Sequence, residues 1–521
     1  MPHSCYNSTP LRNRISLSAP LLRAVTAVVL LAMALGARAQ IGGLPRATPE
    51  DVGLHSADVQ RFFDQVTGFG AEAECHSAIV MRHGRVVGEV YPRPFRAEYS
   101  HTLYSCSKTF TAAAVGIAIS QNRLSLDDRV AAILHSSLPE TVSPELAKMT
   151  VRDLLMMASG ITPDWKMRNS SHDWLRSWLA KPVNGVGTKF AYDSMCTFAL
   201  SAIVQRVTGM RTLDYLKKYV FTPMNITQVD WEESPDGINT GGWGLHLQPE
   251  SMAKFGQMLL NGGRWEDMQL VPEEWVKQMM TPHIKANATD YYGFQMWQCE
   301  FQSAWRADGA FGQYIFIIPD KDMVVVMTQC SHLNATRNRA PVWELARKAV
   351  DGALPTNIGA ARQLAERCAA YAFETPKGQQ TNAYQQSING KTFNLPLTND
   401  LEWKTIRPTF ADGRLTLRIS TRWGQSYDVP CGYGEWLTGT TSALPPYSIK
   451  AVDRFKGIAR NFAVSGSYAW TPAGQLMVHV FYPSWITGAM LVIDPAKMTM
   501  QVTENLLTKP YTLTLTEPRR R

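Results

Sequence analysis

The chain has 521 residues, 45% of them hydrophobic and 10% aromatic, so it can bury a large core and is too long for one ordinary domain. Its formal charge of +8 is not gathered into runs of Lys and Arg with interleaved aromatics, which argues against a nucleic-acid partner. The eleven histidines show no H-E-x-x-H or H-x-H spacing and the eight cysteines form no C-x-x-C pair. We therefore expect neither a metal site nor a cofactor.

The N-terminal segment has the pattern of a secretory signal peptide. Arginines precede the apolar run 24–35, and Ala37-Arg38-Ala39 forms an A-x-A site before Gln40. The run is shorter than the roughly 20 apolar residues that span a membrane. We expect cleavage after Ala39, removal of residues 1–39, and a periplasmic or secreted protein with no stable membrane anchor.

The next segments predict strands, a buried helix and a helical subdomain. Residues 76–91 are typical of two strands around a His83-Gly84 turn. Residues 103–119 carry apolar side chains at helical spacing and predict a helix buried on most sides. From 126 to about 225 the pattern is mainly helical with polar loops.

A second hairpin follows at 313–328, with Pro-Asp-Lys-Asp as its turn, and residues 342–350 predict a helix. Strand pairs at both ends of this region, with helices between them, favour one antiparallel sheet closed by the two ends. The expected fold class is therefore α/β in the broad sense, more narrowly α+β, an antiparallel sheet flanked by helices with a helical subdomain. A site would lie between the sheet and the helical part.

The character of the sequence changes after residue 355. A helix at 358–373 leads into the segment 376–381, which we interpret as a linker. Alternating segments broken by turn residues then predict strands at 414–420, 464–470, 475–482 and 489–493. We divide the chain into a main domain (40–355), a helix and linker (356–380) and a small all-β domain (381–521). We expect the small all-β domain to be either a barrel, for which a lipocalin-like barrel is one candidate, or a sandwich.

Ser105 and Lys108 stand three residues apart at the start of the predicted buried helix. At this spacing two side chains share a helix face, with Cβ atoms roughly 5–6 Å apart. Burial lowers the pKa of a lysine, so Lys108 can accept the serine proton and make Ser105 a nucleophile. A second Ser-x-x-Lys pair, Ser251 and Lys254, shows that chance supplies this spacing, and we interpret that pair as a helix start with Ser251 near the cap.

A serine nucleophile also needs a proton shuttle for the leaving group. Tyr192 and Ser194 place a phenol and a hydroxyl on the loop that enters a predicted helix. A tyrosine beside a lysine relays protons, but tyrosines before helices are common without any such role. The residues alone leave both interpretations open.

Several motifs of this chain occur in the same order as in the serine β-lactamase and penicillin-binding-protein superfamily, and the chain resembles the class C and esterase members of that superfamily. The resemblance covers about 52–352. Met157 stands where many members carry histidine, and methionine there is similar to the branch that contains the 6-aminohexanoate-dimer hydrolases. The segments that carry the resemblance are Tyr104-Ser105-x-x-Lys108, 122–128, 150–161, Gly241-Gly242-Trp243-Gly244-Leu245 and Ala307-Asp308-Gly309.

The resemblance implies an SxxK-type serine hydrolase that forms an acyl-enzyme. Ser105 would be the nucleophile, Lys108 its partner and Tyr192 the general base and acid. Ser194 would take the third position of the family's Tyr-x-Asn or Tyr-x-Ser motif. Gly309 ends the third motif, and the backbone N–H groups of Ser105 and Ala310 would form the oxyanion hole. The family also pairs the strands flanked by Cys75 and Cys330, which makes a disulfide between them a candidate.

One departure from the family restricts the substrate. Lactam-hydrolysing members carry Lys or His at the position of Ala307, where a cation meets a substrate carboxylate. Arg306 is adjacent, but neighbouring side chains leave a strand on opposite faces. We therefore expect a small ester, amide or peptide substrate. A penicillin-binding DD-peptidase or β-lactamase, and an inactive module that binds cell-wall peptides, are the alternatives.

Overall fold

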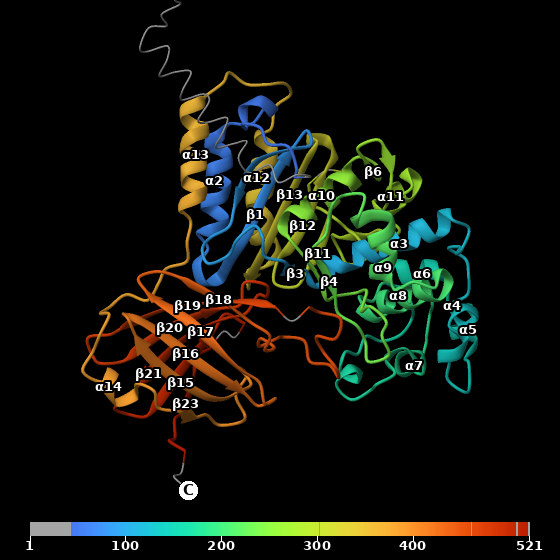
Figure 1. The fold of residues 1–521 in the computed structure, drawn as a ribbon. Helices are drawn as coiled ribbons and strands as arrows, with labels where there is room; N and C mark the ends of the chain where they lie inside the picture. The colour runs from blue at the N-terminus through green and yellow to red at the C-terminus, as the bar shows by residue number, and fades with distance from the viewer. Residues whose placement is uncertain (1–42, 302, 460, 507–508, 519–521) are drawn as a thin grey trace, which may run out of the picture.

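The computed structural model describes residues 43–301, 303–459, 461–506 and 509–518 (Figure 1). The predicted signal peptide, 1–39, lies outside the described residues. Within the described part, none of the helices has the length and apolar character needed to cross a membrane. The chain builds two large sheets, one with helices on both faces and one in an all-β region.

The first sheet has eight strands in the order β2-β1-β13-β12-β11-β10-β9-β8. β1 pairs antiparallel with β13, so segments about 250 residues apart in sequence close the sheet, as predicted. The hairpins around His83-Gly84 and Pro319–Lys321 are also confirmed. The strands are β1 (Ala73–Arg82), β2 (Arg85–Val90), β8 (Ile284–Lys285), β9 (Tyr291–Tyr292), β10 (Trp297–Gln298), β11 (Trp305–Gly309), β12 (Gln313–Ile318) and β13 (Met323–Ser331).

Helices cover both faces of this sheet. α2 (Ser56–Thr67), α12 (Ala335–Lys348) and α13 (Ile358–Ala370) lie together on one side (Figure 1). α10 (Pro249–Leu260) packs on the other side, where a Cβ on Gly256 would lie 2.7 Å from Ile315 Cγ2, so glycine permits the close approach. α12 begins seven residues before the predicted helix. Pro341 lies inside α12, six residues after its first residue.

α3 (Ser107–Ser120) is buried on nearly all sides, as predicted from its small and apolar residues. Gly116 leaves space for Trp275, whose indole N–H donates to the Ala112 carbonyl at 2.9 Å. α3 is surrounded by the helices of the helical subdomain and by α11 (Glu273–Met279). The helices of the subdomain are α4 (Val130–Ile133), α5 (Pro144–Lys148), α6 (Val151–Leu155), α7 (Trp174–Leu179), α8 (Ser194–Thr208) and α9 (Thr212–Leu216). Short strands complete this part: β3 (His101–Thr102), β4 (Val229–Trp231), β5 (Leu245–Leu247), β6 (Arg264–Trp265) and β7 (Met268–Gln269).

The C-terminal region is all-β apart from the short helix α14 (Gln385–Ile388), which confirms the predicted class. Its sheet curls into a half-barrel, and a bridge between Asn394 and Thr516 links the two ends. The strands are β14 (Phe393–Asn394), β15 (Trp403–Ala411), β16 (Arg414–Thr421), β17 (Ser426–Tyr433), β18 (Leu437–Thr441), β19 (Phe462–Trp470), β20 (Leu476–Phe481), β21 (Gly488–Asp494), β22 (Thr499–Glu504) and β23 (Tyr511–Thr514).

The half-barrel contacts the first part of the chain at several places, including the start of β1 and the segment after β13. The stretch interpreted as a linker, 376–381, pairs with the half-barrel through Gln379 and Trp470. The half-barrel loop, defined here as residues 442–459 between β18 and β19, extends toward α7 (Figure 1). There the Val452 N–H donates to the Arg168 carbonyl at 2.8 Å. The all-β region therefore contacts the helical subdomain as well as the sheet.

The disulfide considered for Cys75 and Cys330 is not formed, and all seven cysteines of the described residues are free thiols. In the β1–β13 register Cys330 faces Glu74, whereas Cys75 faces Gln329. Side chains alternate between the faces of a sheet, so the two thiols point to opposite sides. Cys75 packs with α2, and Cys330 packs with Tyr104 and the half-barrel.

Candidate active site

Ser105 lies in a single 3₁₀ turn, Tyr104–Cys106, that leads directly into α3. Every other residue from His101 to Ala118 is buried, and Ser105 alone in this stretch is partly exposed. Tyr104 before it has φ +46°, a left-handed conformation that is unfavourable for a bulky side chain. The fold therefore presents one hydroxyl at the end of a buried helix.

Lys108 stands one turn further along and is 1% exposed. Its Nζ contacts three oxygens: Ser105 Oγ at 2.9 Å, Ser194 Oγ at 2.7 Å and the Gly242 carbonyl at 2.8 Å. Burial lowers the pKa of Lys108 to about 7, although the nearby Asp193 carboxyl favours the charged form. Lys108 is thus an amine that gains and loses its proton near neutral pH.

The Gly241-Gly242 pair brings the carbonyl to this lysine. A Cβ on Gly242 would lie 2.7 Å from the Ser194 carbonyl oxygen and 3.0 Å from Ser194 Cβ, so glycine permits the close approach. Thr111 on α3 donates its hydroxyl to the Gly241 carbonyl at 3.0 Å and fixes the same segment. The sequence analysis singled out Gly241-Gly242 only as part of the family resemblance, and it assigned no role to the Gly242 carbonyl.

Tyr192 lies over the same lysine, with its ring centroid 4.8 Å from Lys108 Nζ. Burial raises the pKa of Tyr192 well above its usual value, while a hydrogen bond with Ser105 acts in the opposite direction. The phenol therefore keeps its proton at neutral pH. Asp193, which the sequence did not single out, caps α8 by accepting from the Met195 N–H at 2.9 Å and so fixes the loop that carries Tyr192.

The end of β11 borders Ser105 on the other side. A Cβ on Gly309 would lie 2.4 Å from the Leu103 carbonyl oxygen, so glycine lets this strand end approach the turn that holds Ser105. The Cys106 thiol donates to the Gln313 carbonyl at 3.1 Å and joins that turn to β12. Ala310 follows β11 as an exposed residue. The structure thus brings Ser105, Lys108, Tyr192, Ser194, Gly309 and Ala310 together.

Ala307 and Arg306 lie on opposite faces of β11, as expected from strand geometry. Ala307 is buried in the core with Ile315, the residue it faces on β12. Arg306 Nε donates to Asp308 Oδ2 at 2.8 Å, and its Nη1 donates to the Gln298 carbonyl at 2.8 Å. Arg306 is therefore engaged in bonds of its own and does not replace the family's cation at position 307.

Gln295 supports the site and was missed by the sequence analysis. Its side chain accepts from the Thr197 hydroxyl at 2.6 Å and donates to the Leu155 carbonyl at 2.8 Å, while its own carbonyl accepts from Thr109 at 3.0 Å. It also has a left-handed φ of +61°. One residue therefore ties α3, α6 and α8 together, and its only sequence signal is a polar residue in the apolar segment 292–297.

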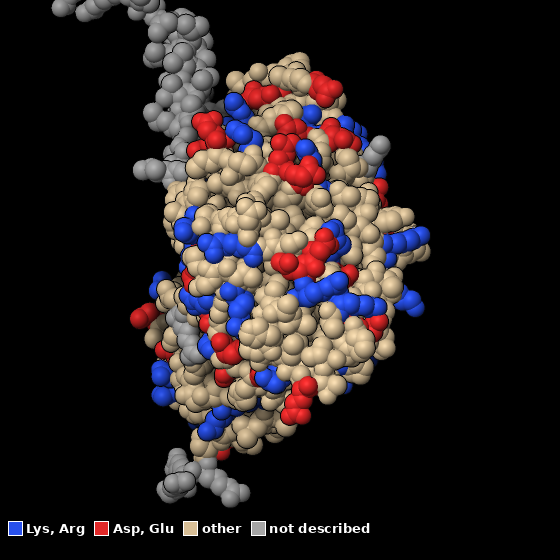
Figure 2. Space-filling view, turned by 90° about the vertical axis from the view of Figure 1, so that its right-hand side faces the viewer, with Lys and Arg blue, Asp and Glu red and all other residues tan. Residues whose placement is uncertain are grey.

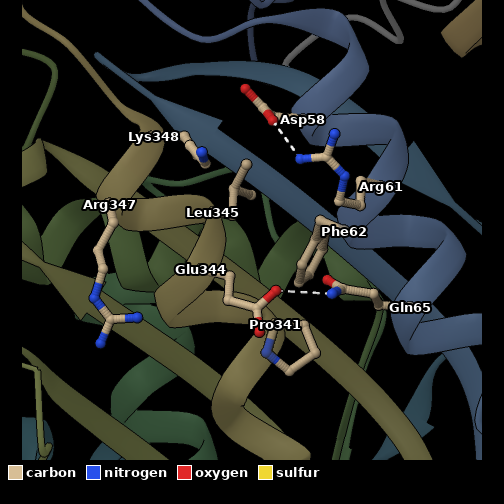
Figure 3. Close-up of a pocket in the computed structure, with 9 residues that line it drawn as sticks. All are labelled: Asp58, Arg61, Phe62, Gln65, Pro341, Glu344, Leu345, Arg347 and Lys348. Atoms are coloured by element: carbon tan, nitrogen blue, oxygen red, sulfur yellow. Dashed lines mark hydrogen bonds and ion pairs between the residues drawn. The ribbon is translucent and has the colours of Figure 1, made fainter.

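A separate hollow of about 300 Å³ lies between α2 and α12 (Figure 3). Four of its polar side chains form two pairs: Arg61 with Asp58 at 2.8 Å, and Gln65 with Glu344 at 2.8 Å. These helices cover the sheet face opposite to α10, so the hollow is not part of the Ser105 site.

The surface charges are mixed. On the face shown in Figure 2, Lys and Arg side chains are interspersed with Asp and Glu rather than gathered by sign. Among the described residues, no group of three or more His, Cys, Asp or Glu side chains is placed to hold a metal ion.

Comparison with known proteins gives a consistent set of similarities. The Beta-lactamase family model matches residues 63–348. The 6-aminohexanoate-dimer hydrolase of Paenarthrobacter ureafaciens is 24% identical over 292 residues, which is 49% of this chain and 72% of that protein. A penicillin-binding-protein homologue from Caulobacter crescentus aligns at 17% identity over 57% of this chain and 97% of its own, with a TM-score of 0.47. The octameric homologue from Pyrococcus abyssi aligns at 16% identity over 88% and 99%, with a TM-score of 0.44.

Proposed function

The chain belongs to the Beta-lactamase family of serine hydrolases, and from this premise we propose that it cleaves an ester or amide bond through an acyl-enzyme on Ser105. The observation that carries the proposal is Lys108 Nζ, held 2.9 Å from Ser105 Oγ in a buried position where its pKa falls to about 7. A lysine with its usual pKa would be protonated and unable to accept a proton at neutral pH.

In the first step Lys108 acts as the base. A neutral amine has two N–H donors and one lone pair. Donation to Ser194 Oγ and to the Gly242 carbonyl leaves the lone pair for the Ser105 hydroxyl. The Ser105 proton moves to Nζ while Oγ bonds to the substrate carbonyl carbon. The backbone N–H groups of Ser105 and Ala310 stabilise the oxyanion that forms.

Tyr192 then acts as the acid. Its phenol gives a proton to the leaving oxygen or nitrogen as the bond to the carbonyl carbon breaks. The resulting phenolate takes the proton back from the Lys108 ammonium, because the pKa of Tyr192 lies far above that of Lys108. In the second half of the reaction, water gives a proton to Lys108 as its oxygen bonds to the acyl carbon. The bond from that carbon to Ser105 Oγ then breaks, and Oγ takes the proton from Lys108, which restores Ser105.

Position 307 bears on the substrate. Ala307 offers no cation at the third motif, and Arg306 is bonded on the other face. Esters and amides that present no carboxylate at this strand edge therefore fit the site better than β-lactams whose carboxylate would lie there. We also propose that the protein is exported to the periplasm or beyond, because the sequence of residues 1–39 has the three parts of a signal peptide.

Labelling with a fluorophosphonate, followed by peptide mass spectrometry, tests the proposal. We expect one adduct on Ser105 that is lost in Ser105→Ala. Ser251→Ala is the matched control, since it removes the serine of the other Ser-x-x-Lys pair and should label like the wild type. No adduct on the wild-type protein, or an adduct that persists in Ser105→Ala, contradicts the proposal.

A substrate panel separates the alternatives. It comprises a chromogenic cephalosporin, p-nitrophenyl esters and D-alanyl amides. Turnover of the esters with little cephalosporin hydrolysis fits the proposal, whereas release of D-alanine identifies a DD-peptidase. Binding of muropeptides without turnover of any compound identifies an inactive binding module.

A further inference from the structure

Arg168 is a buried cation beside the proposed site. It is 4% exposed and lies in the 3₁₀ turn Lys166–Asn169. Its guanidinium carbon lies 4.3 Å from the ring centroid of Trp165 and 4.7 Å from that of Trp243. Nε donates to the Trp165 carbonyl at 3.2 Å, but Nη1 is buried and has no hydrogen-bond partner among the described residues. Buried arginines are rare in proteins unless they are paired.

The position of Arg168 ties it to Ser105 and Lys108. Trp243, which stacks on the guanidinium, follows Gly242, whose carbonyl accepts from Lys108 Nζ. Burial is the main cause of the lowered pKa of Lys108, and the charge of Arg168 adds to it. Arg168 therefore lies within electrostatic reach of the lysine that activates the serine.

Other buried polar groups surround the guanidinium. The Tyr447 hydroxyl and the Trp243 indole N–H lie close to the Glu232 carboxyl and act to lower its pKa, whereas Arg168 Nη1 has no partner among the described residues. Glu232 and Tyr447 both act electrostatically on Arg168, so these groups are neighbours. A buried donor without a partner costs roughly 1–3 kcal/mol, so Arg168 Nη1 marks a place where water or a ligand binds.

The half-barrel supplies one side of this cluster. Tyr447 belongs to the half-barrel loop, and Val452 of the same loop donates its N–H to the Arg168 carbonyl at 2.8 Å. The opposite side comes from the helical subdomain through Trp165 and from the segment after β4 through Glu232. The cluster is thus assembled by both parts of the chain.

The charge of the cluster favours an anion. Burial lowers the pKa of Arg168 to about 10, which leaves the guanidinium protonated at neutral pH. Burial raises the pKa of Glu232 to about 7, so this carboxyl is only partly ionised there. Arg168 acts electrostatically on Glu232, but no ion pair joins the two side chains among the residues that the structure describes. The Asp193 carboxyl also acts electrostatically on Arg168, and burial raises its pKa. Arg168 is therefore a buried cation with two carboxyls near it and no ion pair among the described residues.

We propose that Arg168 binds a carboxylate of the substrate, and so provides the cation that position 307 lacks. The inference rests on the proposed function, because it names the substrate class for the same serine: esters or amides that carry a carboxylate away from the scissile bond. A guanidinium donates two parallel N–H groups to a carboxylate, and its planar face is held by the two indoles.

Two p-nitrophenyl esters of equal acyl length test the proposal. The neutral one is the butyrate and the anionic one is the hemisuccinate. We expect the wild-type protein to prefer the hemisuccinate, and Arg168→Met to lower its kcat/KM by roughly tenfold or more while the value for the butyrate changes less than threefold. Arg168→Lys keeps the charge and should restore part of the preference. Because the preference is a ratio within one protein sample, partial misfolding of a variant cancels out.

Arg306→Met is the matched control, since Arg306 is an equally buried arginine whose donors are already bonded to Asp308 and Gln298. It should change the rates for both esters by the same factor. An equal loss for both esters in Arg168→Met, or no preference in the wild type, overturns the proposal.

Binding in the Ser105→Ala background separates this proposal from the proposed function. Titration with succinamate and with butyramide, followed by calorimetry, needs no turnover. We expect succinamate to bind at least tenfold more weakly to Ser105→Ala/Arg168→Met than to Ser105→Ala, and butyramide to bind both alike. If the wild type hydrolyses neither ester but this difference appears, the proposed function fails and Arg168 still binds a carboxylate. If succinamate binds both proteins equally, the Arg168 proposal fails alone.

Discussion

A serine and a lysine stand three residues apart at the N-terminal ends of two helices of the first core, α3 and α10, and the surroundings of the two pairs differ. Lys108 contacts two hydroxyls and a carbonyl, whereas Lys254 donates to the Met224 carbonyl at 3.0 Å. Ser105 is partly exposed, while Ser251 is buried within the first turn of α10. Burial lowers the pKa of both lysines, and Glu250 opposes this for Lys254. The spacing is therefore the same, but only α3 presents its serine to a substrate.

The difference arises from what lies over each helix. The first turn of α3 meets Tyr192, Ser194 and Gly242, which come from loops far away in the sequence. α10 packs on the first sheet, where Gly256 lets it approach Ile315 and Val324. The local sequence fixes the distance between serine and lysine, and the tertiary partners decide whether that distance has chemical consequences.

The largest expected effect separates the two serines. Ser105→Ala should lower kcat/KM for a p-nitrophenyl ester by roughly 10⁴-fold or more, because removal of a nucleophile abolishes the covalent route. Ser251→Ala should stay within about twofold of the wild type, since a buried serine cannot reach the substrate. Steady-state kinetics on both variants, with circular dichroism to check folding, measure the contrast. Comparable losses in the two variants would mean that the distinction between α3 and α10 is mistaken.

The two lysines differ in their expected effect on the pH profile. Neutral Lys108 is the active form, so kcat/KM should fall by about tenfold per pH unit below a midpoint near 7 and level off above it. In Lys108→Met, kcat/KM should be roughly 10³-fold lower, and it should no longer fall with decreasing pH below pH 7. Lys254→Met should keep the midpoint. Rates from pH 5 to 9 on the three proteins provide the test, and a midpoint that moves in Lys254→Met would contradict it.

The sequence predicted those parts of the fold that depend on local pattern. α3, the two hairpins of the first sheet and four strands of the half-barrel (β16, β19, β20 and β21) follow from periodicity and turn residues. The predicted start of α12 was wrong, since the helix begins seven residues earlier, after Asn334 as its cap, and continues through Pro341. The Cys75–Cys330 bridge failed because the register of two strands decides which side chains face each other.

Parts of the candidate site depend on contacts that leave no local pattern. The carbonyl of Gly242 has no side chain to indicate its role, and Gln295 acts through bonds to three separate helices. Arg168 lies in an irregular segment, and the half-barrel loop that bonds to it is almost 300 residues away. Motif order found the residues that react, whereas the groups that hold them needed the three-dimensional arrangement.

Two glycines offer a smaller test of the same comparison. Gly242→Ala would place a Cβ 2.7 Å from the Ser194 carbonyl oxygen, so either the Gly242 carbonyl or Ser194 must move away from Lys108. We expect kcat to fall roughly 10- to 100-fold in a protein that still folds. Gly256→Ala is the counterpart on α10, where the Cβ meets Ile315 and Val324. It should lower the thermal midpoint and leave kcat per folded molecule within about threefold. Active-site titration with the fluorophosphonate gives the folded fraction, and the reverse pattern would refute this account.

The smallest expected effect comes from the residue before each serine. Ser251 follows Glu250 within a regular helix, whereas Ser105 follows Tyr104, which has φ +46° and whose hydroxyl is hydrogen-bonded to Ser448 Oγ of the half-barrel loop at 2.8 Å. Ser448→Ala removes this partner, and the loss of a partly buried hydrogen bond of about 1 kcal/mol corresponds to roughly a fivefold fall in kcat, with KM little changed.

Ser420→Ala is the control for this last variant, because it breaks a hydroxyl pair with Ser426 on the exposed side of the half-barrel. It should leave kcat unchanged. If the two variants behave alike, the half-barrel covers the first core without positioning Ser105. If only Ser448→Ala slows turnover, the strained conformation at Tyr104 depends on a bond that the half-barrel provides, and α3 differs from α10 through that contact as well.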